Sequence, residues 1–167
     1  MAHNKIIAII SFGYDRFFGV ENVTYNLIQQ ITKLDKKNKY LLFVNEHVQG
    51  LYSSSDNIKK IIVKKMASTQ ILKTLWLILF YPLISFIKRI NITLVINGSN
   101  NFSLSPFTKN IIYIHDLGDL YIKNKYDIKR MLYRKYLALP INKFKGDIFV
   151  AISKATKKTI VEKLKKS

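Results

Sequence analysis

The sequence has no cysteine among its 167 residues, and it has only 10 acidic residues against 28 lysines and arginines. Without cysteine the chain can form neither a disulfide bond nor a thiolate metal site, which favours a reducing, cytoplasmic setting. The sequence also lacks a convincing targeting segment, because the apolar run Ile6–Phe12 is short and leads directly into Asp15 and Arg16. We therefore expect a cytoplasmic protein, either free or peripheral on the inner face of the plasma membrane.

The shortage of acidic residues leaves a net charge of +18. A charge of this sign attracts phosphates on nucleic acid, on anionic lipids or on a phosphorylated substrate. A second explanation is a genome rich in A and T, since lysine, asparagine and isoleucine then rise together, and only four of the basic residues are arginine. The sequence shows no recognisable helix-turn-helix, RNP-type sheet or zinc pattern, so we expect no nucleic-acid partner.

The pattern of apolar residues predicts the fold class. Runs rich in β-branched residues alternate with helical patterns, which predicts an α/β fold: a Rossmann-like, doubly wound, mostly parallel sheet in a single domain. We expect Pro140 to end or kink its helix, and Ser68 and Ser153 to cap helices. The expected strands are 5–12, 40–45, 58–63, 93–97, 110–115 and 147–152, and the expected helices are 20–34, 68–89, 125–139 and 154–166.

One segment, Thr74–Ile87, carries no charge over 14 residues and is interrupted by Pro82. It is short for a membrane-spanning helix, which needs about 20 apolar residues. A core helix and a helix docked on a membrane surface are the other two interpretations. The basic flanks at Lys73 and Lys88–Arg89, together with Trp76 near one end, suit docking on an anionic lipid surface.

Ligands of open α/β sheets bind outside the carboxyl ends of the strands, so three loops are candidate sites. These loops follow Phe12, Asn97 and His115. The first loop contains Gly19 directly before a helix, where free backbone N–H groups favour an anion. The two glycines of this loop, Gly13 and Gly19, do not supply the three-glycine dinucleotide fingerprint, which argues against a nicotinamide dehydrogenase.

The pair His115–Asp116 leaves an apolar strand, Ile111–Ile114, where a substrate could reach it. An imidazole can donate to or accept from a sugar hydroxyl, and a carboxylate can accept from one or orient the ring. The alternative is that the pair forms only a turn or a helix cap. His3 and His47 lie far away in sequence without metal-ligand spacing, so we expect no metal site.

Five segments in order resemble the N-terminal domain of family 4 retaining glycosyltransferases, which have the GT-B architecture. The segment Gly19–Leu27 is similar to the glycine loop and first helix of that family. Asn97–Pro106 followed by Ile111–Leu117, which reads IIYIHDL, resembles its central strand, loop and turn. Tyr133–Tyr136 and Asp147–Lys154 are similar to the helix and the serine-ended strand that close the domain.

The resemblance implies roles for the matching residues. His115, with Asp116 beside it, would face the transferred sugar or the acceptor hydroxyl, so both are candidate catalytic residues. Gly19, Asn97 and Ser153 are candidates for binding the donor phosphate or substrate. The family often has two adjacent glycines where this chain has Phe18 and Gly19, and often an arginine where it has Asn22.

The resemblance also implies a reaction: transfer of a hexose from a nucleotide-diphosphate sugar to a cell-surface glycan or lipid-linked acceptor, with retention and without a cofactor or metal. In this family a C-terminal domain supplies most nucleotide contacts, and residues 1–167 match only the acceptor-side domain. We therefore expect nucleotide-sugar binding only together with such a half, and no turnover by the chain alone. The alternative function is a basic peripheral membrane or nucleic-acid-binding α/β module without catalysis.

Overall fold

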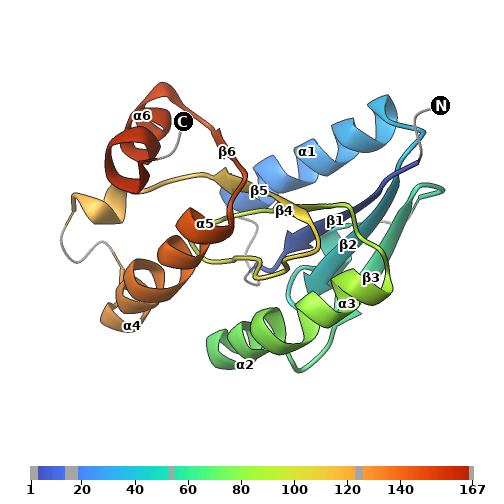
Figure 1. Ribbon diagram of the computed structural model, residues 1–167, viewed down its shortest axis with the longest axis horizontal. Helices are drawn as coiled ribbons and strands as arrows, with labels where there is room; N and C mark the ends of the chain where they lie inside the picture. The colour runs from blue at the N-terminus through green and yellow to red at the C-terminus, as the bar shows by residue number, and fades with distance from the viewer. Residues whose placement is uncertain (1–3, 14–18, 53–54, 123–125, 166–167) are drawn as a thin grey trace.

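The computed structural model describes residues 4–13, 19–52, 55–122 and 126–165, and its centre is a six-stranded sheet (Figure 1). All strand pairs are parallel, and the order is β3-β2-β1-β4-β5-β6. The order reverses between β1 and β4, which is the switch point where α/β sheets bind ligands. The strands are β1 Ile6–Ser11, β2 Lys39–Asn45, β3 Ile58–Val63, β4 Ile92–Val95, β5 Lys109–Ile114 and β6 Ile148–Ala151.

Helices cover both faces of the sheet, which confirms the doubly wound α/β prediction. Helix α1, Gly19–Leu34, packs on one face, where Ile28 joins a core cluster with Ile9 and Leu42. The other face carries two long helical segments, one comprising α2 Gln70–Leu75, η2 Trp76–Phe80 and α3 Tyr81–Ile87. The second comprises α4 Ile128–Tyr133, η4 Arg134–Ala138 and α5 Leu139–Lys145. After β6, a separate helix, α6 Lys154–Thr159, continues into η5 Ile160–Leu164.

The two long segments share an unusual feature at their prolines. Each contains one π-helical turn, and that turn ends two residues before Pro82 in one segment and before Pro140 in the other. Proline lacks the N–H that an α-helix needs and its ring crowds the preceding turn, so a wider turn accommodates it. Of the two expected effects of Pro140, to end or to kink its helix, the structure excludes the first, because the helix continues to Lys145.

The helix caps follow the sequence closely. Ser153 caps α6 as predicted, since its Oγ accepts a hydrogen bond of 3.1 Å from the backbone N–H of Thr156. For α2 the cap is Thr69 rather than Ser68, because the Thr69 hydroxyl accepts from the N–H of Leu72 at 3.3 Å. The polar residue adjacent to the expected one therefore performs the same task.

The long segment Gln70–Ile87 is neither fully buried nor fully exposed. By length and composition it could cross a membrane, with a mean hydropathy of 1.7, but 28% of it is buried within the fold. Trp76, Leu77 and Tyr81 belong to the core, so the interpretation of Trp76 as an interfacial anchor is wrong. Lys73 is also buried and therefore does not form a basic flank. The opposite side exposes Ile71, Leu75, Leu79, Leu83, Phe86 and Ile87.

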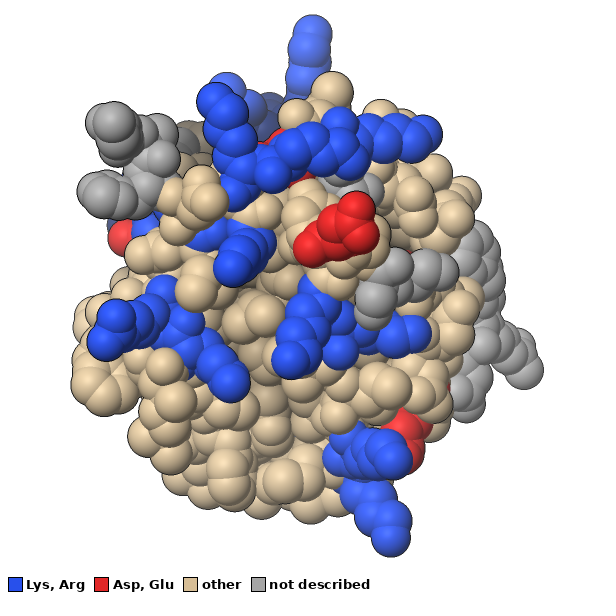
Figure 2. Space-filling model, turned by 90° about the vertical axis from the view of Figure 1, so that its right-hand side faces the viewer, with Lys and Arg blue, Asp and Glu red and all other residues tan. Residues whose placement is uncertain are grey.

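The excess of basic residues is visible on the surface. Figure 2 shows one face on which Lys and Arg side chains gather in several groups, with only small areas of Asp and Glu. An exposed ion pair between Lys158 and Glu162 in α6, with 3.8 Å between the charged atoms, involves one of the few acidic residues. The positive potential on this face therefore comes from several separate groups rather than from one continuous stripe.

Candidate functional site

The five residues proposed from the sequence all lie at the carboxyl ends of strands. Asn97 follows β4, His115 and Asp116 follow β5, and Ser153 follows β6. Gly19 opens α1, the helix after β1, but its surroundings lie outside the described part of the chain. Because all strands are parallel, these loops share one edge of the sheet, as expected.

His115 is buried at this edge. Its ring lies 5.0 Å from that of Tyr113, and its backbone carbonyl accepts a 3.5 Å hydrogen bond from the hydroxyl of Thr156. Its Nε2 is buried and has no hydrogen-bond partner among the residues that the structure describes. Burial lowers the pKa of His115, because desolvation disfavours the charged imidazolium. The imidazole is therefore mostly neutral at neutral pH.

Asp116 is held in place by several contacts. Its Oδ1 accepts from the backbone N–H of Gly118 at 2.6 Å, which closes an Asx turn, and its Oδ2 accepts from the hydroxyl of Tyr126 at 3.4 Å. Its carbonyl accepts from Ser99 Oγ and from Arg134 Nη2, each at 2.9 Å. The alternative interpretation of Asp116 as a turn residue is thus supported, and the turn positions His115 beside it.

Asn97 starts a buried polar loop. Its φ of 56° is left-handed, a conformation that asparagine tolerates better than most residues. Its carbonyl accepts from the N–H groups of Asn100 and Asn101, and its Oδ1 accepts from the Asn100 side chain at 3.4 Å. Asn97 therefore shapes the loop rather than extending a free side chain to a ligand.

Ser153 is connected to His115 through one intermediate residue. Its Oγ lies 3.0 Å from the hydroxyl of Thr156, which donates to the His115 carbonyl. The structure thus brings His115, Asp116 and Ser153 together, and Ser99 joins the loop of Asn97 to the same turn. Among the described residues, no group of three or more histidines and carboxylates could hold a metal ion.

Two buried basic residues at this edge are not among those proposed from the sequence. Arg134 is 2% exposed and Lys73 is 6% exposed. Lys73 Nζ donates to the Asn100 carbonyl at 3.1 Å, the same oxygen that accepts from the Tyr133 hydroxyl at 3.2 Å. The guanidinium of Arg134 lies 4.9 Å from the ring centre of Tyr126. Lys73 and Tyr133 therefore tie the two long helical segments to the polar loop after β4, while Arg134 ties the second segment to the turn at Asp116.

Helical spacing could have found both residues. Lys73 lies three and four residues before the core residues Trp76 and Leu77. Arg134 lies four residues before the core residue Ala138. A basic residue that falls on the apolar stripe of a helix points into the fold.

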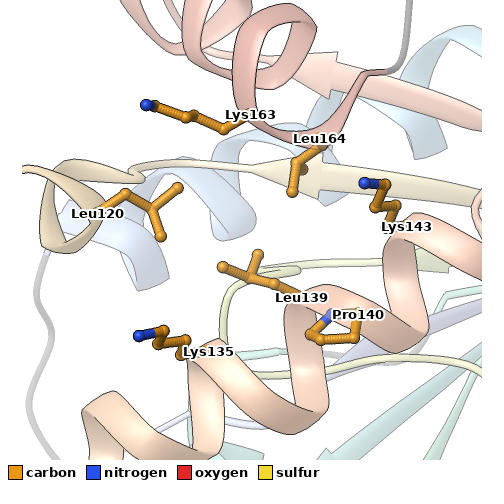
Figure 3. A pocket seen from close by; sticks show the side chains of 7 residues that line it. All are labelled: Leu120, Lys135, Leu139, Pro140, Lys143, Lys163 and Leu164. Carbon is orange, nitrogen blue, oxygen red and sulfur yellow. The ribbon is translucent and has the colours of Figure 1, made fainter.

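A wide groove lies beside this edge, between α5 and η5 (Figure 3). Its volume is about 400 Å³. Apolar side chains project between the two helices, and the amino groups of lysines lie around them. This lining suits a molecule with an apolar body and negative charge. The groove is lined by Leu120, Lys135, Leu139, Pro140, Lys143, Lys163 and Leu164.

Comparison of the chain with protein-family models and with curated proteins finds no match. The family resemblance therefore remains an expectation from the motifs of this one sequence.

Proposed function

We propose that this chain is the acceptor-binding domain of a retaining glycosyltransferase that moves a hexose from a nucleotide-diphosphate sugar to a cell-surface glycan or lipid-linked acceptor. The observation that supports this best is the buried Nε2 of His115, which has no partner among the described residues. A buried polar atom without a hydrogen bond costs about 1–3 kcal/mol, and a sugar hydroxyl would offset that cost. The fixed turn at Asp116 holds the ring in place for such a contact.

The family resemblance implies that His115 would face the transferred sugar or the acceptor hydroxyl. The chemistry of a neutral imidazole is compatible with that role. Such a ring can accept a proton from a hydroxyl or donate one to an oxygen. The groove between α5 and η5, with its apolar floor and lysines, supports a lipid-linked acceptor in particular. Nucleotide contacts would come mostly from a second domain, so we expect no turnover of a nucleotide sugar by these 167 residues alone.

The proposal is tested by ligand-observed NMR with a panel of alkyl glycosides that carry single hexoses or N-acetylhexosamines. His115→Phe keeps a ring against Tyr113 but removes Nε2, so it should weaken glycoside binding about tenfold. Tyr113→Phe, which changes the other ring of the same contact, should bind like the wild type. Equal binding by His115→Phe, no binding by the wild type, or turnover of a nucleotide sugar by the chain alone would overturn the proposal.

A second candidate function, attachment to an anionic membrane surface, is favoured by the exposed apolar side of residues 70–87. Leu79 is 61% exposed and Leu83 is 56% exposed. The neighbouring segment α4–η4–α5 packs on the same face of the sheet and exposes Ile128, Leu132 and Tyr136, with exposed lysines among them. Apolar side chains beside basic ones suit anionic headgroups over an acyl layer.

Vesicle flotation tests this second function. Leu79→Ser with Leu83→Ser should reduce binding to vesicles of phosphatidylglycerol and phosphatidylcholine about tenfold. The matched control is Leu34→Ser, which removes an exposed leucine of α1 on the opposite face of the sheet, where Leu34 is 84% exposed. Unchanged flotation of the double variant, or an equal loss with Leu34→Ser, would contradict docking through this side.

A further inference from the structure

A small cavity lies at the carboxyl ends of β1 and β2, separate from His115. Its volume is about 40 Å³. It is bounded by Gly13 after β1, by Asn45 at the end of β2, and by Gln70 and Lys73 in the first turns of α2. Lys73 also reaches the loop after β4 through its hydrogen bond to the Asn100 carbonyl. The cavity therefore lies at the carboxyl ends of β1 and β2, and Lys73 connects it to the loop after β4.

In the described part of the chain, uncharged groups hold the ammonium group of Lys73. Among the described residues no carboxylate forms an ion pair with it, and its partners are the Asn100 carbonyl and the ring of Tyr133. Removing a charge from water without such a pair costs several kcal/mol. Burial, together with the nearby charge of Arg130, lowers the pKa of Lys73 to about 7. Since burial disfavours the charged form, an anion beside the amino group would stabilise protonated Lys73.

Gln70 lines the same cavity. The Nε2 of Gln70 is buried and has no acceptor among the described residues. Lys73 Nζ has three hydrogens, and one of them is used by Asn100. Two side chains with unused donors thus meet at one cavity, which is the arrangement that an oxyanion with several acceptor oxygens requires.

The size of the cavity limits the ligand. A buried water needs a cavity of about 10–15 Å³, counted as the space open to its centre, so this cavity has room for about three waters. A single phosphoryl group has three terminal oxygens and fills a comparable space. A sugar ring or a nucleobase is too large, so the remainder of a phosphate ester would lie outside.

We propose that this cavity binds the terminal phosphoryl group of a phosphate ester, with Lys73 and Gln70 as its donors. The ester could be a soluble sugar phosphate or nucleotide, or a lipid whose headgroup ends in a phosphate. This inference does not depend on the transferase proposal, because it uses different residues and a different ligand group.

The test observes the lysine side chains by NMR in a protein carrying ¹³Cε-labelled lysine. Inorganic phosphate should shift the Lys73 resonance in a saturable manner and raise the measured pKa of its amine by at least about one unit. Lys73→Met and Gln70→Glu should each weaken phosphate binding at least about tenfold. Lys109→Met, which alters an exposed lysine at the opposite edge of the sheet, should bind like the wild type.

Two further arms distinguish the sources of the phosphate. Uridine diphosphate should compete with inorganic phosphate if the ligand is soluble. Vesicles that contain phosphatidic acid, but not those with phosphatidylglycerol, should compete if it is a lipid, because only the former ends in a phosphoryl group. The proposal would be overturned if phosphate shifted only the resonances of exposed lysines, or if Gln70→Glu bound phosphate as the wild type does. Both outcomes can be read even if Lys73→Met fails to fold.

Discussion

The polar loop after β4 and the helical segment 70–87 reverse the ordinary arrangement of polar and apolar residues. The loop is polar and buried, whereas one side of the segment is apolar and exposed. The two regions are neighbours, joined by the hydrogen bond from Lys73 to Asn100. The buried polar residues of the loop are Ser99, Asn100, Asn101, Ser103 and Ser105, and the exposed apolar residues include Ile71, Leu75, Leu79, Leu83, Phe86 and Ile87.

The difference between the regions follows from the partners available to each. In the loop, Asn101 Nδ2 donates to the carbonyls of Phe12 and Ile96, which offsets much of the cost of burying this amide group. On the exposed side of 70–87, apolar side chains meet water, which costs free energy in proportion to their area. Hydrogen bonds within the fold therefore hold the buried loop, including those from Lys73, Tyr133 and Asn142, whereas the apolar side of the helix is left in contact with water.

The largest expected effect comes from removing two hydrogen bonds that hold the buried loop. Asn142 Nδ2 donates to the carbonyls of Gly98 at 2.5 Å and Asn101 at 2.8 Å. Asn142→Leu keeps the volume but leaves both carbonyls without this donor, which should lower the free energy of unfolding by about 3 kcal/mol. Urea unfolding measures the change, with Asn26→Leu on the exposed side of α1 as the control. A loss below about 1 kcal/mol would mean that the loop does not depend on Asn142.

The next effect concerns the charge that joins the two regions. The pKa of Lys73 is about 7 in the fold and 10.5 in the unfolded chain. Between these values the unfolded chain binds more protons, so this group makes stability rise with pH, by up to about 1.4 kcal/mol per pH unit. Lys73→Met removes this dependence.

In phosphate-free buffer, the stability difference between wild type and Lys73→Met should therefore change by about 2 kcal/mol from about pH 7.5 to about pH 9. The change should favour the wild type as the pH rises. Guanidinium unfolding at several pH values measures it, and Lys109→Met should show no such trend. A difference that stays constant with pH would show that Lys73 remains protonated in the fold.

A smaller effect is expected at the start of the loop. Asn97 has a φ of 56°, where a Cβ is crowded, and alanine tolerates this conformation poorly. Asn97→Ala should cost about 1 kcal/mol, and Asn97→Gly should cost less because glycine adopts this φ freely. Thermal unfolding compares the two variants. An equal cost would assign the effect to the lost hydrogen bond with Asn100 instead of to the backbone.

Much of this architecture could be predicted from the sequence, because its signals are local. The run Lys5–Phe12 contains β1, and Ser153 caps α6 as its position predicts. The candidate site residues fall at one edge because all strands are parallel. Helical spacing could have placed Lys73 on the buried side of its helix, but its partner could not be predicted, since Asn100 lies 27 residues away. An adjacent apolar run also made Lys73 resemble a basic flank.

The smallest expected effect on stability concerns the exposed side of 70–87, and it sharpens the comparison with the loop. Leu79→Ser and Leu83→Ser should each change the free energy of unfolding by less than about 0.5 kcal/mol, because both side chains are already largely in water. Leu77→Ser, from the same segment but fully buried, should cost at least about 3 kcal/mol. If the exposed variants cost as much as Leu77→Ser, those leucines would stabilise the fold itself. A small cost combined with lost vesicle binding would instead assign them to an external partner, which is how the two sides of one helix can serve different purposes.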